Sequence, residues 1–219
     1  MPRITSIKPQ KSKRSLAGGA GKKRVNIYLD SKFGFGIDLE NFVKLGLKVE
    51  QELTEEKVSE IVKKAEFQKT LDKLLGFATL RSRSEKEVHG WFLRKKVHES
   101  LQSDLLERLR HFELLDDAKF ARWWIGQRLQ FKSKSKKALI FELKGKGMNQ
   151  NIIDDVLAEV QVDEGTLAVE LLKKKDRNLP RGKAGWDGPK MLRYLGGRGF
   201  DWETARESVK IHLEWRNKT

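Results

Sequence analysis

The sequence predicts a mainly α-helical protein, in which three tandem three-helix repeats form an elongated curved rod behind a small N-terminal extension that contains a β-hairpin. Three observations predict this fold class. Apolar residues recur at spacings of three and four through most of the 219 residues, as they do on one face of a helix. Segments 84–97, 135–148 and 187–200 fall into register at spacings of 51 and 52 residues. Apolar residues alternate over 25–37, which is the pattern of paired strands.

The extension covers residues 1–53. Its first 24 residues contain eight cations and no carboxylate, and they predict a first strand near Ile4 and Ile7 followed by a basic loop over 9–21. The alternation around residues 30–32 predicts the hairpin. The alternating apolar residues are Val25, Ile27, Leu29, Phe33, Phe35 and Ile37.

Two glycines and a short apolar segment complete the extension. Gly34 and Gly36 lie inside the predicted hairpin, where glycine indicates a bulge or a close approach of the backbone. Residues 39–45 predict a short helix that ends at Gly46.

The first repeat covers 54–115, together with a lead-in helix that begins at Thr54, Glu55 and Glu56. Apolar residues at helical spacing define its first and third helices. They are Phe67, Leu71, Leu74 and Leu75, and then Leu101, Leu105, Leu106 and Leu109.

The second repeat covers 116–162 and has the clearest pattern. Its first helix follows Asp116 and Asp117, and a basic loop at 132–135 separates it from the second helix. The glycines in 145–147 end the second helix, and Asn149 opens the third. The inward stripes are Phe120, Ala121, Trp124 and Ile125, then Leu139, Ile140 and Leu143, then Ile152, Ile153, Val156, Leu157 and Val160.

The third repeat covers 163–219, and equivalent residues recur at the middle helix of all three repeats. Ser84, Ser135 and Asp187 take the N-cap position, where a side-chain oxygen satisfies a free helix N–H. Ser84 with Glu87 also matches a capping box. The recurrent core residues are Val88, Leu139 and Met191, followed by Phe92, Leu143 and Leu195. Lys95, Lys146 and Arg198 end each helix, and Gly147 and Gly199 follow two of them.

Composition limits the class of protein. The formal net charge of +15 and the pI of about 9.9 favour a polyanionic partner, either nucleic acid or an acidic protein surface. The chain has no cysteine, so disulfides and thiolate metal sites are excluded. Neither an apolar run long enough to span a membrane nor an apolar N-terminal segment is present, and the expected location is the cytoplasm.

No arrangement of residues predicts catalysis, a metal or another cofactor. His89, His98, His111 and His212 lack metal-ligand spacing. The pairs 116–117 and 154–155 could be metal-binding carboxylates of a nuclease, but helix caps and solvated helix faces explain them better. Residues 18–23 lack the spacing of a phosphate-binding loop. The sequence therefore predicts a binding protein rather than an enzyme.

Basic residues at the helix junctions are the candidate binding site. Because the units repeat, equivalent cations recur along one side of the predicted rod, where they can follow a phosphate backbone or an acidic groove. The predicted contacts are Arg83, Lys86, Lys95, Arg122, Arg128, Lys132, Lys136, Lys137, Lys144, Lys146 and Arg198. Trp91, Trp123 and Trp124 are interpreted as packing residues rather than base-stacking platforms.

Several of these motifs resemble the RecX family of recombinase regulators. The resemblance depends on residues 115–123 and 142–148 in the second repeat, with 83–87 and 194–200 in the other two. Residues 4–7 and 25–30 resemble the small β extension of longer family members. The sequence departs from the family at two places. The pair Lys96-Val97 stands where the family usually has a glycine followed by an apolar residue, and the insert 178–185 contains Gly, Pro and Lys.

The resemblance implies a non-enzymatic, monomeric regulator that binds the RecA–DNA filament and restrains its ATPase, strand-exchange and co-protease activities. Single-stranded DNA would then be a partner, either directly or through the filament. Two alternatives stay open. One is a DNA- or RNA-binding protein that needs no recombinase, which the basic N-terminal segment favours, and the other is a metal nuclease that depends on Asp116.

Overall fold

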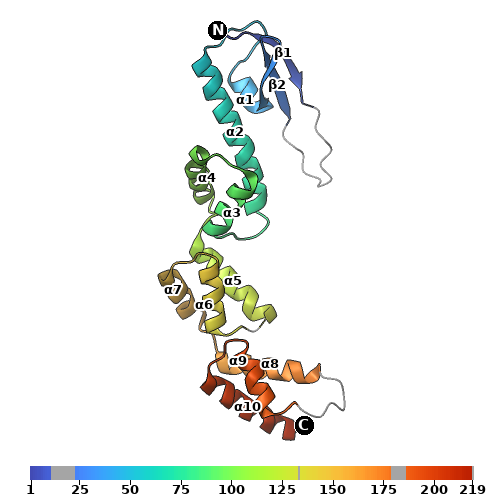
Figure 1. Ribbon diagram of the computed structural model, residues 1–219, viewed down its shortest axis with the longest axis vertical. Helices are drawn as coiled ribbons and strands as arrows, with labels where there is room; N and C mark the ends of the chain where they lie inside the picture. Colours follow the sequence, from blue (N-terminus) through green and yellow to red (C-terminus); the bar gives the residue numbers. More distant parts are fainter. Residues whose placement is uncertain (11–22, 133, 179–185, 219) are drawn as a thin grey trace. The chain divides into compact units, whose positions relative to one another are not determined.

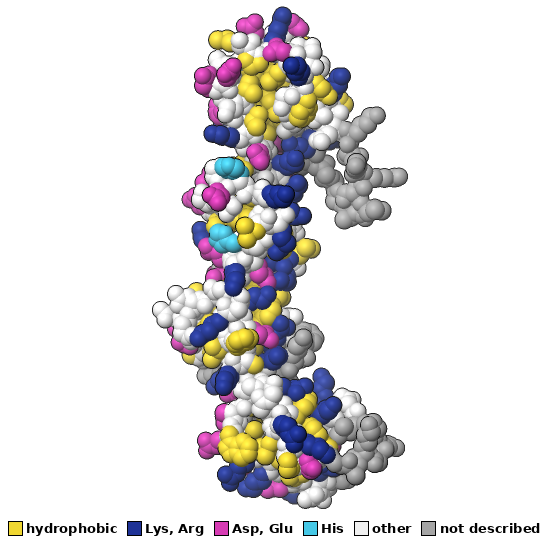
Figure 2. Space-filling view, in the orientation of Figure 1, with side chains coloured by type: hydrophobic (Ala, Val, Ile, Leu, Met, Phe, Trp, Pro, Cys, Tyr) yellow, Lys and Arg dark blue, Asp and Glu magenta, His cyan; other side chains and the backbone are white. Residues whose placement is uncertain are grey.

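The computed structural model describes residues 1–10, 23–132, 134–178 and 186–218, with side chains for all of these except Phe131 and Lys132. The predicted basic loop of 9–21 and the insert of 178–185 therefore lie largely outside the described residues. The chain forms two compact units, Met1–Phe77 and Ala78–Thr219. Charged side chains cover much of the visible surface of each unit (Figure 2). None of the described helices is long and apolar enough to cross a membrane.

The first unit contains a three-stranded antiparallel sheet with the order β1-β2-β3 (Figure 1). The strands are β1 (Ile4–Pro9), β2 (Arg24–Leu29) and β3 (Lys32–Asp38). Asp30 and Ser31 join β2 to β3 with φ values of 47° and 66°. Two successive positive φ values are typical of a two-residue hairpin turn whose twist matches that of the strands. The predicted hairpin is confirmed, and β1 extends it.

A bulge interrupts the hairpin at Gly34. Ile27 pairs with Phe35 and Tyr28 pairs with Phe33, so Gly34 has no opposite residue. This confirms the bulge that the glycines predicted. The same bulge takes Phe33 out of the alternating apolar set, because the extra residue turns it onto the face of Tyr28. Phe33 is 61% exposed there.

Two helices complete the first unit. The side chain of Asp38 accepts a hydrogen bond from the N–H of Asn41 at 2.9 Å and so caps α1 (Leu39–Lys44). The longer α2 (Glu55–Ala78) follows. Its residues Ile61 and Ala65 join the core of the unit, with Val58 packed against them. The remaining buried members of this core are Ile4, Val25, Ile27, Phe35, Ile37, Leu47 and Leu53.

The second unit consists of helices that follow one another in the predicted order. They are α3 (Glu85–Lys95), α4 (Glu99–His111), α5 (Asp117–Lys132), α6 (Lys136–Gly145), α7 (Gln150–Val160), α8 (Glu164–Arg177), α9 (Gly188–Gly196) and α10 (Trp202–Asn217). A mainly helical chain behind a small sheet is therefore confirmed. The division into four segments at 53/54, 115/116 and 162/163 stays a prediction.

The predicted caps begin the middle helix of each repeat. The side chains of Ser84, Ser135 and Asp187 accept hydrogen bonds from the backbone N–H three residues later, in α3, α6 and α9. Glu87 differs from the capping-box interpretation, because its carboxylate accepts hydrogen bonds from the side chains of Arg81 and Lys146.

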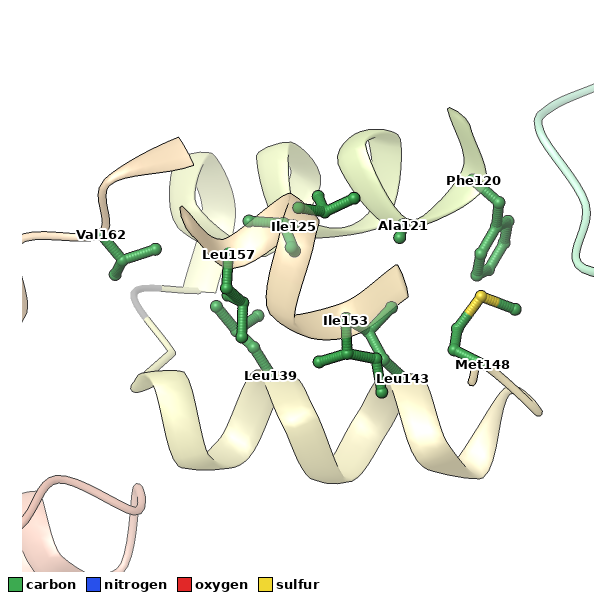
Figure 3. Close-up of a cluster of buried hydrophobic side chains, with 10 residues drawn as sticks. Phe120, Ala121, Ile125, Leu139, Leu143, Met148, Ile153, Leu157 and Val162 are labelled. Carbon is green, nitrogen blue, oxygen red and sulfur yellow. The ribbon is translucent and has the colours of Figure 1, made fainter. Parts of the chain in front are cut away.

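Helices α5, α6 and α7 enclose a core of their own. Phe120, Ala121 and Ile125 of α5 point toward Leu139 and Leu143 of α6, and side chains of α7 and Met148 complete the cluster (Figure 3). A second cluster joins α8, α9 and α10 through Leu172, Met191, Leu195, Ala205 and Val209. Because each group of helices surrounds a separate apolar cluster, the structure agrees with the repeat that the sequence predicted.

The N-cap serines also connect successive groups of helices within the second unit, because the start of α3 meets the end of α6 and the start of α6 meets the end of α9. The hydroxyl of Ser84 donates to the carbonyl of Lys146 at 3.0 Å, and that of Ser135 donates to the carbonyl of Arg198 at 3.0 Å. Both serine side chains are fully buried. Each hydroxyl therefore satisfies a backbone N–H of its own helix and a carbonyl of the next group, which fixes where the groups meet.

A glycine completes each of these junctions. Gly147 and Gly199 have φ values of +85° and +86°, and they follow α6 and α9. A Cβ atom on Gly147 would lie 2.9 Å from Cβ of Lys86, and one on Gly199 would lie 2.7 Å from Oγ of Ser135. Glycine is required at both positions by backbone conformation and by space.

Candidate functional site

The predicted basic site lies in the second unit, on α3, α5, α6 and α9 or directly beside them. Figure 2 shows Lys and Arg side chains, in dark blue, on the visible face of this unit, with magenta Asp and Glu side chains among them. The structure separates the predicted residues into cations that are exposed and cations that contact other side chains of the chain.

The exposed group consists of lysines. Each has an exposed side chain, and none has an ion pair with a carboxylate among the residues that the structure describes. These lysines are Lys86 and Lys95 of α3 and Lys136, Lys137 and Lys144 of α6.

Lys136 and Lys137 lie in an unfavourable position for helix stability. They occupy the first turn of α6, which contains no acidic residue, whereas the first turn of α3 contains Glu85 and Glu87. A helix N-terminus carries partial positive charge, so lysines in the first turn oppose the helix dipole. The carboxylate of Glu164 accepts a hydrogen bond from the main-chain N–H of Lys136 at 2.9 Å. The two amines remain available to an anionic partner.

The junctions bring cations of successive groups together. At the first junction Lys86 lies against Gly147, next to Lys146 at the end of α6. At the second junction the N-terminus of α6, with Lys136 and Lys137, meets the carbonyl of Arg198 through Ser135. The sequence prediction that equivalent cations recur at each junction thus has a structural basis in the repeated serine contact.

Several predicted cations are held by carboxylates. Nε and Nη2 of Arg122 donate to the two carboxylate oxygens of Glu159 at 2.7 and 3.0 Å. Nε of Arg128 lies 2.6 Å from Glu142, and Nζ of Lys146 lies 2.7 Å from Glu87. Part of the charge of these residues is therefore neutralised within the chain.

The ring of Trp124 is the centre of a cation–aromatic network at the first junction. The Arg128 guanidinium and the Lys146 amine lie 4.0 and 4.6 Å from the ring centroid. The indole N–H of Trp124 donates to Glu142 at 2.9 Å. Such contacts stabilise cations over an aromatic face. The interpretation of Trp124 as a packing residue is supported, because it also packs against the core of α5, α6 and α7.

Two carboxylates of this network remain ionised despite their partial burial. Burial raises the pKa of Glu87, but hydrogen bonds from Arg81 and Lys146 outweigh it and hold the pKa below its ordinary value. Burial also opposes ionisation of Glu142, where hydrogen bonds from Arg128 and Trp124 lower the pKa overall. The network is thus a set of paired charges that stabilises the junction.

The remaining predicted residues have intermediate positions. Arg83 is half-buried, and its backbone forms a bridge with Leu115. Burial, followed by the charge of Arg81, lowers its pKa. Arg198 lies 3.6 Å above the ring centroid of Tyr194. Lys132 ends α5, and its side chain lies outside the described residues.

Sequence reasoning did not assign the acidic partners Glu87 and Glu142 to this region. Arg81 and Lys134 belong to the basic residues that the sequence places at the helix junctions, but they were not among the predicted contacts. Arg81 forms two hydrogen bonds with Glu87, at 2.9 and 3.0 Å, and Lys134 lies 3.5 Å from Glu142. Glu142 is a local signal that could have indicated its pairs, because it is the single acid between Ala121 and Asn149, whereas Glu87 lies beside a second acid, Glu85.

Three of the four acids considered for a metal site accept hydrogen bonds within the chain. Asp116 accepts a hydrogen bond from the N–H of Lys119 at 2.9 Å and so caps α5. Asp117 accepts one from the N–H of Glu85 at 3.0 Å. Asp154 accepts one from the side chain of Gln150. Across the described part of the chain, no group of three or more His, Asp and Glu residues could hold a metal ion.

Known proteins are similar in sequence to this chain over most of its length. Residues 2–54 match the family model of the Regulatory protein RecX N-terminal domain, and residues 116–157 match that of the RecX second three-helix domain. The chain is 30% identical to Regulatory protein RecX of Clostridium perfringens strain 13 over 213 residues, which cover 96% of each chain. It is 32% identical to Regulatory protein RecX of Bacillus licheniformis over 183 residues, which cover 82% of this chain and 66% of the relative.

Two solved structures share the fold. A crystal structure of a regulatory protein RecX superimposes with a TM-score of 0.65 at 24% identity, over 96% of this chain and 99% of the other. The crystal structure of RecX from Lactobacillus salivarius gives a TM-score of 0.52 at 23% identity, over 67% of this chain and 96% of the other. At these identities the structural likeness supports the fold alone.

Proposed function

Because this chain belongs to the RecX family of regulatory proteins, we propose that it is a non-enzymatic regulator that binds a RecA-type recombinase filament on single-stranded DNA and inhibits it. The inhibited activities are the filament's ATPase, strand exchange and co-protease function. In this proposal the exposed lysines of the second unit contact the filament, and the paired cations hold the junctions that present them.

One observation carries the proposal beyond the family relationship. Lys136 and Lys137 are exposed in the first turn of α6, against the helix dipole, and the turn contains no acidic residue. Residues that contradict a local stability rule without an evident gain are expected at functional sites. The main-chain N–H groups at this helix start already bind Glu164 and Ser135, so the two exposed amines are the groups that suit phosphate or carboxylate groups of a partner. A filament of DNA and acidic protein grooves offers such groups repeatedly, so weak contacts can add through avidity.

The experiment is a measurement of recombinase ATPase on single-stranded DNA, with this protein added below one copy per recombinase. Inhibition at such ratios supports binding to the filament. Inhibition only when the DNA is saturated would support the alternative, a nucleic-acid-binding protein that acts without a recombinase.

Charge reversal tests the assigned residues. Lys136→Glu with Lys137→Glu should raise the concentration needed for half inhibition by about tenfold or more, because like charges brought together at an interface cost several kcal/mol. Helix stability should change little, because acids are favourable in a first turn but a glutamate at position 136 lies close to the carboxylate of Glu164.

The matched control is Lys63→Glu with Lys64→Glu. These two lysines are also adjacent and exposed, but they lie within α2 of the first unit. Nζ of Lys64 lies 2.6 Å from Glu60, so thermal unfolding must verify that the control variant folds. The control changes the net charge equally and should retain inhibition. Equal loss from both double variants would mean that overall charge, rather than the N-terminus of α6, is responsible.

A further inference from the structure

The first unit has a sheet face that its core does not use. Val25, Ile27, Phe35 and Ile37 point into the core, so the alternate residues of β2 occupy the opposite face. β1 adds Lys8 and Ser6 to this outer face, opposite Asn26 and Tyr28. The bulge at Gly34 brings Phe33 beside Tyr28, with ring centroids 6.0 Å apart and ring planes at 84°. The outer face therefore carries two aromatic rings side by side.

A groove of about 400 Å³ adjoins the ring of Phe33, along β3 at the edge of the sheet. Residues 33–36 of β3 line it together with Arg24 and Asn26 of β2, and residues of α2 form its wall. Phe33 is 61% exposed at its edge. An aromatic ring of this size that remains exposed beside a concave surface is a candidate contact for a ligand.

Glycine leaves the groove open at Gly36. Gly36 has no positive φ value, so its backbone conformation does not require glycine. A Cβ atom there would lie 3.3 Å from the side-chain oxygen of Asn26 and 3.8 Å from the carbonyl of Val25, which a small adjustment of Asn26 can accommodate. The absence of a side chain instead leaves bare backbone beside Phe33, which lets a planar group approach closely.

The charges around the groove favour an anionic ligand. The amine of Lys8 lies 5.0 Å from the ring centroid of Tyr28, and a guanidinium nitrogen of Arg24 donates to the carbonyl of Gly36 at 2.9 Å. Lys69 of α2 lines the groove, with Glu66 as the opposing charge. Aromatic rings next to cations are the combination with which proteins bind single strands, since bases stack on the rings and phosphates meet the cations.

We propose that this outer face is a binding site for single-stranded nucleic acid. Phe33 and Tyr28 stack on bases over the open backbone of Gly36, and Lys8, Arg24 and Lys69 contact the phosphates. The site lies in the first unit and needs no recombinase, so it can be tested separately from the proposed regulatory function.

The test measures binding of the full-length chain to a fluorescent deoxythymidine oligomer of about ten nucleotides. Phe33→Ala should weaken binding by between about 5-fold and about 150-fold, the loss expected when one stacked base loses its aromatic partner. Phe33→Trp should retain binding. Phe141→Ala is the matched control, because Phe141 is 80% exposed on α6 of the second unit and its loss should leave binding unchanged.

Either of two results would overturn the proposal. One is unchanged affinity in Phe33→Ala, and the other is an equal loss in Phe33→Ala and Phe141→Ala. Phe33→Ala should retain the wild-type unfolding midpoint, because the ring is largely exposed. A second variant, Gly36→Val, fills the groove with a residue that suits a strand, and it should weaken binding without changing the sheet.

Photochemical crosslinking provides a measurement that does not depend on a variant. An oligomer that carries 5-iododeoxyuridine should form adducts with Phe33 or Tyr28, identified by peptide mass spectrometry. Adducts confined to the second unit would overturn the assignment.

Discussion

His212 shows how a single buried side chain can make stability depend on pH. Its ring is completely buried, with Nε2 3.3 Å from a carboxylate oxygen of Asp176. Neither ring nitrogen makes an aligned hydrogen bond with a described residue. Burial is the largest influence and lowers the pKa of His212 below its ordinary value of 6.5, with smaller contributions from Arg216 and Lys173, while Asp176 acts in the opposite direction. The folded ring is therefore neutral at pH 7.

This arrangement predicts a loss of stability on acidification. The unfolded chain takes up a proton near pH 6.5, whereas the folded ring does so only at lower pH. The unfolding free energy should therefore fall as the pH drops below about 6.5, by at most about 1.4 kcal/mol per pH unit from this group. Urea unfolding of the wild type and His212→Phe at pH 7.5, 6.5 and 5.5 measures the difference.

The comparison between variants isolates His212 from other groups. Burial raises the pKa of Asp117, which gives a contribution of opposite sign at acidic pH that is common to both proteins. His111→Gln is the control, because His111 is exposed in the last turn of α4 and should retain the wild-type pH dependence. If His212→Phe also retained the wild-type pH dependence of the unfolding free energy, the buried ring of His212 would not be the source of that dependence.

Helices α3 and α6 are both followed by a residue in the left-handed backbone conformation, but the residue type differs. α6 is followed by Gly147, with φ at +85°, whereas the position after α3 is Lys96, with φ at +53°. The N–H of Lys96 still donates to the carbonyls of Phe92 and Leu93. Lys96 thus ends α3 as glycine would, although its Cβ atom is unfavourable in this conformation.

Replacing adjacent lysines by glycine should therefore have opposite effects. Lys96→Gly should raise the unfolding free energy by about 1 kcal/mol, because it removes left-handed strain. Lys95→Gly, one residue earlier inside the helix, should lower it by about 1 kcal/mol. Both side chains are exposed, so the same urea titration compares them directly. Two changes of the same sign would show that the conformation of Lys96 is not strained.

The sequence predicted these elements well where the determinant is local. The N-caps at Ser84, Ser135 and Asp187 depend on neighbours three residues away, and the hairpin turn at Asp30 and Ser31 depends on two residues. Phe33 was wrongly grouped with the alternating apolar residues, because a bulge at Gly34 shifts the register between two strands. Alternation alone cannot show on which side of a bulge a residue points.

The candidate site was predictable only in part, because charge neutralisation is not local. Lys146 and Glu87 are 59 residues apart in the sequence, and Arg122 and Glu159 are 37 apart. Counting cations along the chain cannot identify such pairs. The exposed lysines of α6 were predicted because the helix start at Ser135 was correct. The curved-rod shape and the filament contacts remain predictions.

At the scale of the molecule, the net charge of +15 is organised in two different ways. Among the described residues, the exposed lysines of α3 and α6 in the second unit lie over no aromatic ring, whereas its Arg128 and Lys146 lie over the half-buried ring of Trp124. The first unit combines Lys8 and Arg24 with the half-buried ring of Tyr28 and the exposed ring of Phe33. Point charges suit any anionic surface, whereas rings with charges suit unpaired bases. The two surfaces should therefore have different partners and different salt dependences.

The last prediction is that the two surfaces can be inactivated separately. Lys136→Glu with Lys137→Glu should lose recombinase inhibition and still bind the deoxythymidine oligomer at about 300 mM salt, where screening leaves stacking as the main contribution. Phe33→Ala should lose oligomer binding at that salt and retain most of the inhibition. Raising the salt concentration from about 50 to about 200 mM should weaken inhibition by the wild type, because displaced counterions drive contacts between lysines and phosphates. Measuring recombinase inhibition and oligomer binding for both variants gives a four-way comparison, and thermal unfolding verifies the fold of each variant. If each variant lost both activities, the lysines of α6 and the outer face of the sheet would act as one site, and the assignment of separate partners would be wrong.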